Sequence, residues 1–411
     1  MRSLAILSMH TSPLAQPGTG DGGGMNVYVR ELAAALARAG VGCDVYTRAW
    51  SPDLSAVVDV EPGLRVHHVA AGPLSPVVKE ALPGLVDEFT EGVRARMEGA
   101  HPADAIHANY WLSGLAGHAL KHDLDLPLVS TFHTLARVKA EGDDHPRRRA
   151  EAEAAVMACS DAVLASGTVE AAQLASLYGA DPARIGIVPP GVEHAFFSPG
   201  NRVQARRALG LPGGVPMLLF VGRIQPLKGV DVAVRALERL VDHPGAFLAV
   251  VGGPSGPEGQ AEMERLRRLV TSLGLDAADT RGRRHVRFLP PQPHELLSTY
   301  YRAADVCLVP SRSESFGLVA LEAAACGTPV VAAAVGGLLT LVEDGGTGFL
   351  VEGRDPAAFA GRVSELLSDA DQAARLSARA ARRARGYTWS GAAERLRRVY
   401  AEVTARSLVE C

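Results

Sequence analysis

Short, continuously apolar segments alternate with longer amphipathic segments along most of the chain. In the first half, the apolar segments cover residues 3–9, 43–47, 64–69, 105–109, 126–133 and 162–167. Segments with helical periodicity separate them, for example over residues 27–39 and 150–159. An apolar run that is not interrupted by polar residues is typical of a strand buried on both faces, as in a parallel sheet covered by helices.

The same alternation starts again after a stretch rich in proline and glycine at residues 188–201. The second set of apolar segments covers residues 216–222, 246–253, 286–290, 306–311, 329–337 and 348–352. We therefore predict an α/β protein of two doubly wound, Rossmann-like domains whose ligand crevices lie at the carboxyl ends of the strands and face each other across a cleft. The predicted domains are residues 1–193 and 194–386, and a helix within residues 387–411 is expected to return to the first domain.

The composition argues against some classes of protein function. The length of 411 residues suits two domains, and a net charge of −3 argues against a general nucleic-acid binder, which needs a basic surface. No apolar run approaches the roughly 20 residues that span a bilayer, so we expect no membrane span and a cytoplasmic location. The five cysteines are scattered singly, and we therefore expect reduced thiols rather than a zinc site or a disulfide.

Two pairs of charged residues in the second half suit a nucleotide ligand. Arg223 and Lys228 follow a predicted strand, five positions apart, where a guanidinium fork and an ammonium can hold a diphosphate. Glu314 and Glu322 are separated by seven residues at the start of a predicted helix, and their carboxylates can accept hydroxyls of a ribose or a sugar. Either pair alone would also fit a solvated surface.

The stretch "GTGDGGGMN" at residues 18–26 places five glycines directly before a predicted helix. Glycine loses much conformational freedom on folding, so such a cluster is costly unless the backbone must approach a ligand closely. We interpret it as a loop that brings backbone N–H groups toward an anion or a sugar at a helix N-terminus.

The R-x4-K pair, the E-x7-E element and the glycine loop, in this order, resemble the retaining GT-B glycosyltransferases of family 4. The resemblance implies catalytic roles for Arg223, Lys228 and His133, and charge stabilisation without a required cofactor. It implies a UDP-sugar donor site that comprises Gln16, Pro17, Gly24, Arg223, Lys228, Gln292, Glu314, Ser315, Phe316, Gly317 and Glu322. Relatives of this class can also bind a structural Mg²⁺ and form dimers; the matching metal positions are Tyr301, Arg302, Ala304 and Thr328.

The segments "SMHTSPLAQPGTGDGGGMNVYV", "HANYWLSG" and "STFHTLARVK" resemble more particularly the glycosyltransferases that start mycothiol biosynthesis. Those enzymes transfer N-acetylglucosamine from UDP-GlcNAc to 1D-myo-inositol 3-phosphate. The resemblance implies a phosphate site of Lys79, Tyr110, Thr134 and Arg149, with Arg147 or Arg148 as alternatives for the last. The full implied acceptor site comprises His10, Asp21, Gly22, Gly23, Gly24, Met25, Asn26, Lys79, Tyr110, Thr134 and Arg149.

Two alternatives remain open from the residues. The acceptor could be an aminocyclitol or another sugar phosphate, although a set of phosphate-binding residues argues against an acceptor that lacks a phosphate. The chain could also be a non-catalytic module that only binds a nucleotide sugar, although both charged pairs are intact.

Overall fold

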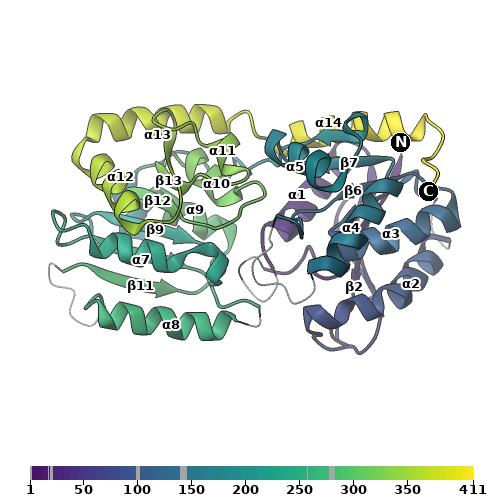
Figure 1. Cartoon of the computed structure of the whole chain (residues 1–411), viewed down its shortest axis with the longest axis horizontal. Helices are drawn as coiled ribbons and strands as arrows, with labels where there is room; N and C mark the ends of the chain where they lie inside the picture. Colours follow the sequence, from purple (N-terminus) through teal and green to yellow (C-terminus); the bar gives the residue numbers. More distant parts are fainter. Residues whose placement is uncertain are drawn as a thin grey trace. The chain divides into compact units, whose positions relative to one another are not determined.

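The computed structural model describes residues 2–16, 18, 22–98, 102–138, 146–256, 258–276 and 283–411. The chain forms two compact units (Figure 1). Unit 1 comprises Met1–Ala15, Gly24–Gly191 and Trp389–Cys411. Unit 2 comprises Gln16–Gly23 and Val192–Thr388, so most of the glycine loop is grouped with the second unit.

Unit 1 is built on an eight-stranded sheet with the order β3-β4-β2-β1-β5-β6-β7-β8. Its strands are β1 (Ser3–Leu7), β2 (Gly42–Arg48), β3 (Val57–Glu61), β4 (Leu64–Val69), β5 (Ala105–Asn109), β6 (Leu128–Thr131), β7 (Ala162–Ala165) and β8 (Ile185–Ile187). Every described pairing is parallel except β3 with β4. The sequence pattern missed the two edge strands, since β3 is half-exposed and interrupted by acidic residues and β8 has only three residues.

Helices cover both faces of this sheet. They are α1 (Gly24–Arg38), α2 (Val86–Glu98), α3 (Trp111–Leu124), α4 (Pro146–Cys159), α5 (Thr168–Tyr178) and α14 (Trp389–Thr404), with short 3₁₀ turns η1 (Lys79–Leu85) and η2 (Pro182–Arg184). Helices α2 and α3 pack on one buried cluster with β1 and β5. Helix α14, although last in the sequence, packs against α1.

Unit 2 contains a six-stranded sheet, all parallel, with the order β11-β10-β9-β12-β13-β14. Its strands are β9 (Met217–Val221), β10 (Phe247–Val251), β11 (His285–Leu289), β12 (Val306–Val309), β13 (Val330–Ala333) and β14 (Gly348–Val351). Its helices are α6 (Arg202–Ala208), α7 (Val230–Glu238), α8 (Gly259–Ser272), α9 (His294–Ala303), α10 (Leu318–Ala325), α11 (Leu338–Leu341), α12 (Pro356–Ser368) and α13 (Ala370–Ala384), with the turn η3 (Pro226–Lys228).

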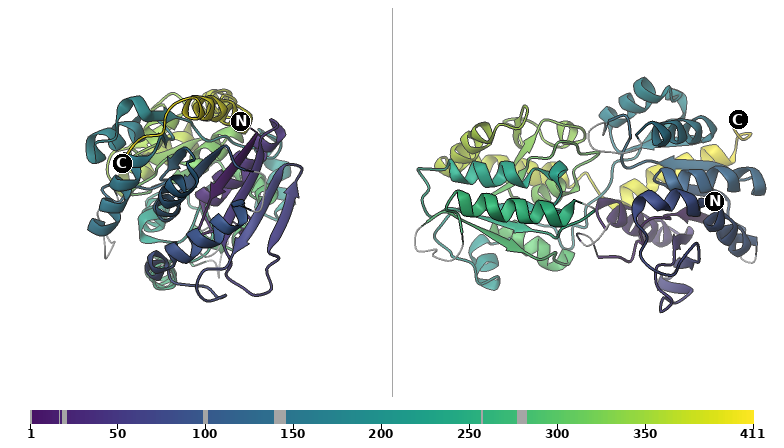
Figure 2. Two further views of the ribbon diagram at one scale, coloured as in Figure 1. Left: turned by 90° about the vertical axis from the view of Figure 1, so that its right-hand side faces the viewer. Right: turned by 60° about the horizontal axis from the view of Figure 1, so that its bottom comes forward.

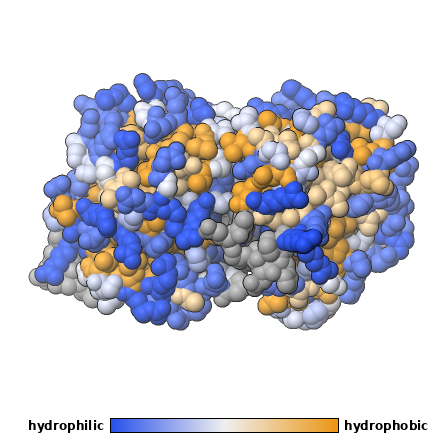
Figure 3. All heavy atoms as spheres, viewed as in Figure 1, coloured by the Kyte–Doolittle hydropathy of each residue, from blue (hydrophilic) through white to orange (hydrophobic). Residues whose placement is uncertain are grey.

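Burial of both sheet faces explains the continuous apolar runs. In β9, Leu218 and Phe220 join a core with α7, α8 and α12. The alternate residues Met217 and Leu219 join a second core with α9 and α10. The predicted fold class, two Rossmann-like α/β units, is therefore confirmed. Within unit 2, Figure 2 shows α7 and α8 side by side, and Figure 3 shows a hydrophilic surface along α8.

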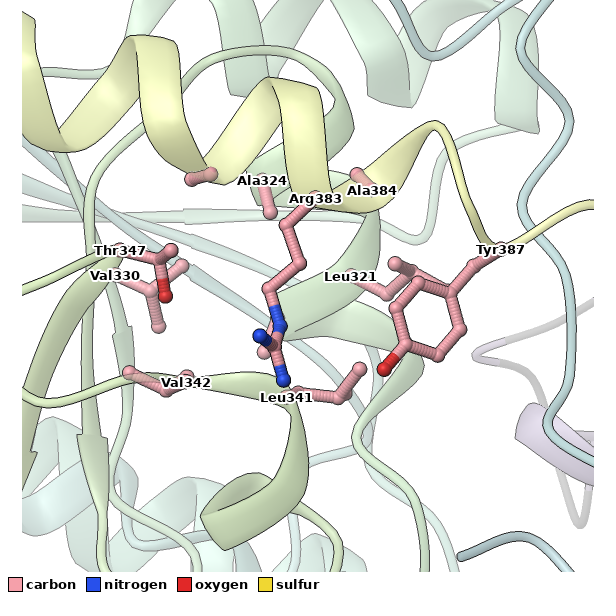
Figure 4. A pocket seen from close by; sticks show the side chains of 11 residues that line it. Leu321, Ala324, Val330, Leu341, Val342, Thr347, Arg383, Ala384 and Tyr387 are labelled. Carbon is pink, nitrogen blue, oxygen red and sulfur yellow. The ribbon is translucent and has the colours of Figure 1, made fainter.

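A small apolar pocket in unit 2 lies between α10, α13 and the end of α11 (Figure 4). Arg383 extends into it from α13 and donates a hydrogen bond to the Thr340 carbonyl at 2.7 Å. The other side chains around it are mainly aliphatic, with Tyr387 at one side. We interpret this pocket as a packing gap beside an arginine that ties two helices together.

The expectation of unpaired cysteines is wrong for two of the five. Cys159 and Cys411 form a disulfide between residues 252 positions apart, with their Cα atoms 5.4 Å apart. Cys43, Cys307 and Cys326 are buried and free. Sequence spacing could not reveal the pair, because only the return of the C-terminal segment to unit 1 brings Cys411 to the end of α4. Among the described residues, no helix is long and apolar enough to cross a bilayer.

His107 links the sheet of unit 1 to α14 and makes its stability depend on pH. Its Nε2 lies 2.8 Å from Thr131 Oγ1 and its Nδ1 lies 2.8 Å from the Tyr400 hydroxyl. Burial lowers the pKa of His107 to about 3. The unfolded chain therefore binds a proton below about pH 6.5 that the folded unit does not, so stability falls as pH decreases toward 3.

We predict that this histidine contributes a loss of about 1.4 kcal/mol of unfolding free energy per pH unit below pH 6. The substitution His107→Gln should remove that share of the pH dependence. Hydrogen exchange of the β5 and β6 amides, measured between pH 7 and pH 5 and corrected for intrinsic rates, reports this free energy. His243→Gln in unit 2 serves as the control; an unchanged pH slope in His107→Gln would contradict the assignment.

Candidate active site

Charged side chains of unit 2 meet beyond the carboxyl ends of two neighbouring strands. Lys228 ends the turn that follows β9, and Glu314 lies in the loop that follows β12. The Lys228 ammonium forms an ion pair with Glu314 Oε1, and the Ser311 hydroxyl donates to the same oxygen at 2.9 Å. The structure therefore brings together one member of the R-x4-K pair and one member of the E-x7-E element.

Two glycines fix the loop that carries Glu314. A Cβ built on Gly336 would lie 1.9 Å from the Glu314 carbonyl oxygen, and one on Gly337 would lie 2.4 Å from Phe316 Cα. The Gly337 amide donates to the Glu314 carbonyl at 2.9 Å. Neither glycine was predicted as a site residue, although a pair of glycines shortly after β13 is a signal of close backbone approach.

The loop continues into α10 through Ser315, Phe316 and Gly317. Gly317 adopts φ 95°, a conformation that favours glycine, and its carbonyl accepts the Leu321 amide at 3.1 Å. Glu322, five residues after Gly317, is among the buried residues of this helix. The predicted donor segment is thus a sharp turn followed at once by a helix N-terminus, which is favourable for a negatively charged group.

Glu322 of α10 is buried next to Tyr301 of α9. Its Oε2 accepts a hydrogen bond from the Tyr301 hydroxyl at 2.7 Å. Burial raises the pKa of Glu322 to about 7, although the tyrosine bond acts in the opposite direction. A carboxyl group with this pKa changes its charge near neutral pH, and hydroxyl groups that donate to it would favour its ionised form.

Arg223 lies beside the glycine loop within unit 2. A Cβ built on Gly23 would be 3.3 Å from Arg223 Nε, a spacing that is tight for any larger residue. The loop also closes on itself, because the Gly18 amide donates to the Gly22 carbonyl at 2.9 Å. Gln16 belongs to the same segment, whereas Pro17 and Asp21 lie outside the described residues.

Gln292 is placed by a local contact after β11. Its Nε2 donates to the Pro290 carbonyl at 2.8 Å. The structure therefore gives no direct contact between Gln292 and the Lys228–Glu314 pair, and its predicted donor role stays a prediction.

Two cations of unit 1 lie against a single aromatic ring. Lys79 Nζ is 4.7 Å and Arg149 Cζ is 5.0 Å from the centroid of the Tyr110 ring. The His10 ring is 4.3 Å from the same centroid. These four residues come from four separate segments of the chain, and we call them the Tyr110 cluster. The two positive charges repel each other, and the carboxylate of Glu153, paired with Arg149, compensates part of this repulsion.

Arg149 is oriented by buried partners. Its Nη2 donates to Thr134 Oγ1 at 3.0 Å, and its Nε donates to Glu153 Oε1 at 2.8 Å. Glu153 lies one turn later on α4, is fully buried, and also accepts the Ala136 amide at 2.9 Å. Arg147 and Arg148 are exposed, so Arg149 is the arginine of this segment that the structure places beside Thr134.

Arg48 holds the loop that precedes Lys79 through backbone carbonyls, and it was not among the predicted site residues. Its Nε donates to the Ala71 carbonyl at 2.8 Å and its Nη2 to the Ser75 carbonyl at 3.0 Å. Burial lowers the pKa of the Arg48 guanidinium. The guanidinium thus fixes the loop that leads into η1, whose first residue is Lys79.

Backbone strain marks two of the predicted site residues. Tyr110 adopts φ 74° and ψ 156°, a region that is otherwise almost restricted to glycine. His133 adopts φ 62°, inside a three-residue turn closed by the Thr134 amide and the Phe132 carbonyl at 2.7 Å. Strain of this kind costs about 1–3 kcal/mol per residue and concentrates at functional sites.

His133 is held as a neutral ring. Its Nε2 lies 2.9 Å from Asn109 Oδ1, and its ring packs edge-on to Tyr28 at 4.8 Å. Burial, with a smaller effect of His107, lowers the pKa of His133 to about 3. At neutral pH the ring can therefore donate or accept a hydrogen bond but carries no positive charge.

The first residues of α1 are tied to the core and to the loop after β1. Gly24 begins the helix, and Met25 packs against the apolar core that contains Tyr110. The buried Asn26 side chain donates to Thr11 Oγ1 at 2.6 Å, which anchors the helix to the loop after β1. These contacts fix the helix N-terminus next to the strand end that carries His10.

The predicted metal positions form a packed corner of unit 2. The Tyr301 carbonyl accepts the Thr328 hydroxyl at 2.6 Å and the Ala304 amide at 3.1 Å. The Arg302 guanidinium donates to the Phe196 carbonyl at 2.9 Å. Hydrogen bonds therefore engage the Tyr301 carbonyl and the Thr328 hydroxyl in this corner, and the Mg²⁺ site stays a prediction.

Comparison with known proteins identifies the family. Residues 22–196 match "Glycosyltransferase Family 4", and residues 201–383 match "Glycosyl transferases group 1". The D-inositol 3-phosphate glycosyltransferase of Thermomonospora curvata is 49% identical and covers 97% of this chain and 94% of its own length. The chain is a family 4 glycosyltransferase of the GT-B class. The protein of the same name from Actinosynnema mirum is also 49% identical, over 98% of this chain and 97% of its own length.

Solved structures agree with this glycosyltransferase assignment. A sucrose-phosphate synthase from Thermosynechococcus elongatus has a TM-score of 0.90 at 34% identity, covering 98% of this chain and 100% of that one. The Anabaena protein HepE, solved with UDP and glucose, has a TM-score of 0.77 at 19% identity, over 98% of this chain and 100% of its own, and shares the fold.

We predict that Glu322→Gln stabilises unit 2 of the glycosyltransferase above neutral pH. A buried carboxyl with a raised pKa lowers stability as pH rises from about 4.5 through about 7, because the unfolded chain releases the proton first. At pH 8 the glutamine variant should gain about 3 kcal/mol of unfolding free energy, and at pH 5 less than about 1 kcal/mol. Urea unfolding at both pH values measures this.

Glu264→Gln, an exposed change on α8, provides the matched control. If Glu322→Gln changed the unfolding free energy equally at pH 5 and pH 8, burial would not raise the pKa of Glu322.

Proposed function

We propose that this glycosyltransferase transfers N-acetylglucosamine from UDP-GlcNAc to 1D-myo-inositol 3-phosphate with retention of configuration, the first step of mycothiol biosynthesis. Relatives named D-inositol 3-phosphate glycosyltransferase, 46–49% identical over almost the whole chain, support the acceptor. The observation that carries the proposal is the approach of Lys79 and Arg149 to the same Tyr110 ring.

The acceptor phosphate would bind at the Tyr110 cluster. A phosphate dianion is best held by a guanidinium fork, an ammonium and one or two hydroxyl donors. These groups would come from Arg149, Lys79, Thr134 and the Tyr110 hydroxyl. The hydrogen bond from Arg149 Nη2 to Thr134 Oγ1 holds two of these side chains next to each other. His10, against the same ring, would contact the inositol.

The donor would bind at unit 2. The guanidinium of Arg223 and the ammonium of Lys228 would hold the diphosphate, Glu322 would accept the ribose hydroxyls, and Glu314 would accept hydroxyls of the transferred sugar. The Lys228–Glu314 ion pair holds these two side chains next to each other. Gly22 and Gly23 of the loop beside Arg223 would let the backbone approach the phosphates.

The reaction would follow a front-face course. The acceptor hydroxyl attacks the anomeric carbon from the side on which UDP leaves, the bond from that carbon to the β-phosphate oxygen breaks, and the hydroxyl proton passes to the β-phosphate. Arg223 and Lys228 would stabilise the charge that develops on the departing phosphate. The neutral His133 would supply a hydrogen bond beside the reacting sugar. We expect the transfer itself to require no metal, and a structural Mg²⁺ near Tyr301 stays an expectation from the family.

Two further expectations remain proposals. We place the reaction in the cytoplasm, as expected from the sequence. Association of two copies is an expectation from the family, and solution scattering would measure it.

We predict strong discrimination between phosphorylated and free inositol. With UDP-GlcNAc as donor, kcat/KM should be at least about 100-fold higher for inositol 3-phosphate, since charge-assisted bonds contribute about 1.5–3 kcal/mol each. Arg149→Lys keeps the charge but loses the fork, and should raise KM for the phosphorylated acceptor about tenfold or more while UDP binding is unchanged. Arg147→Lys, on the exposed face of the same helix, should behave as wild type.

Equal turnover of inositol and its phosphate would reject this acceptor site and favour the phosphate-free cyclitols. No turnover of any acceptor, with UDP-GlcNAc still bound, would favour a non-catalytic binding module.

We predict a separate effect on the donor side. Arg223→Ala and Lys228→Ala should each lower kcat by about 10²–10³-fold, because each removes a charge that acts on the leaving phosphate. Arg235→Ala, which removes an exposed arginine on α7, is the matched control. Initial rates at saturating acceptor measure the effect, and a near-normal kcat for Arg223→Ala would remove this residue from the mechanism.

A further inference from the structure

Four side chains with metal-binding atoms meet in unit 1, outside the Tyr110 cluster. His118 and His122 belong to α3, Cys159 is the last residue of α4, and Cys411 ends the sequence. One ligand atom from each residue lies within 4.8 Å of the ligand atoms of all the others. Figure 1 shows the yellow C-terminal segment reaching α3.

The fold holds these residues in place without a contribution from the active-site residues. His118 and His122 are four positions apart, so they project from the same face of α3. The buried Lys121 ammonium, between them in sequence, donates to the Cys159 carbonyl at 2.8 Å and to Asp161 Oδ2 at 2.9 Å. The other oxygen of Asp161 accepts the Val409 amide at 2.7 Å, which fixes the C-terminal segment next to the same corner.

The distances between sulfur and nitrogen match a tetrahedral metal site. His122 Nε2 is 3.4 Å from Cys159 Sγ and 3.4 Å from Cys411 Sγ, and His118 Nε2 is 3.8 Å from Cys411 Sγ. A tetrahedral zinc ion, with bonds of about 2.3 Å to sulfur and about 2.0 Å to nitrogen, places such atoms about 3.5 Å apart. Two thiolates with two imidazoles are a ligand set that favours zinc.

We propose that His118, His122, Cys159 and Cys411 bind one Zn²⁺ when both cysteines are reduced. The Cys159–Cys411 disulfide is then the oxidised, metal-free form of the same site. Two molecules of a thiol reductant convert the disulfide to two cysteine thiols and leave as their own disulfide. Binding of Zn²⁺ then releases two protons, and the sulfurs separate to about 3.8 Å, the edge of the tetrahedron.

The metal would act on stability and not on the transfer reaction. None of the four ligands belongs to the Tyr110 cluster or to the donor residues. Cys411 follows α14, and Tyr400 of α14 is hydrogen-bonded to His107 in the sheet. A zinc ion would therefore tie the end of the chain to α3 and α4 and hold α14 on unit 1, in the reduced form as the disulfide does in the oxidised form.

The test uses the full chain, reduced with a metal-free phosphine and handled without oxygen. We expect one equivalent of Zn²⁺ per chain. Co²⁺ in its place should give the visible bands of a tetrahedral ion together with a sulfur-to-cobalt charge-transfer band in the near ultraviolet. Cys411→Ser should lower the affinity at least 100-fold while UDP binding remains. His122→Asn should also bind more weakly, and His243→Asn is the histidine control.

Three results would overturn the proposal. They are no zinc bound beyond the amount bound by Cys411→Ser, a cobalt spectrum without the charge-transfer band, and a disulfide that resists thiol reductants at cytosolic potentials. Zinc should also raise the thermal midpoint of the reduced protein and leave that of Cys411→Ser unchanged, which distinguishes a built site from adventitious binding.

Discussion

The proposed acceptor site of this glycosyltransferase depends on the placement of two cations against one strained tyrosine. Lys79 and Arg149 approach the Tyr110 ring within 5.0 Å of its centroid, and each is held there from behind. Arg149 is fixed by Glu153, and the loop before Lys79 is fixed by Arg48. Cation–π contacts and the Glu153 carboxylate compensate part of the repulsion between the two positive charges. An anionic acceptor would add a second negative partner, which fits a substrate that carries a phosphate.

The candidate site in unit 2 also gathers charged groups, but there a positive and a negative group lie side by side. Lys228 and Glu314 neutralise each other, whereas Glu322 is buried next to a tyrosine hydroxyl, where its negative charge is unfavourable. The glycines at 336 and 337 hold the Glu314 loop too closely for any side chain. Both units therefore contain groups that folding alone does not favour, as expected where binding rather than stability has been selected.

Much of this could be predicted from the sequence. Continuous apolar strands and helical periodicity indicated two parallel-sheet units, because burial on both faces leaves a clear pattern. The edge strands β3 and β8 were not predicted, since one is half-exposed and the other has three residues. Motif spacing predicted donor roles for Lys228, Glu314 and Glu322, of which the structure pairs the first two. The resemblance implied a phosphate site of four residues that the structure brings together, namely Lys79, Tyr110, Thr134 and Arg149. The supporting residues Arg48 and Glu153, and the pairing of Cys159 with Cys411, depend on contacts between distant segments that no local pattern records.

The most direct test of the central claim is a crystal structure with UDP and inositol 3-phosphate bound. The account predicts the acceptor phosphate within hydrogen-bond distance of Lys79 Nζ, the Arg149 guanidinium and Thr134 Oγ1, with the inositol ring near His10. A phosphate bound elsewhere, with Lys79 and Arg149 in contact only with solvent or protein, would contradict it.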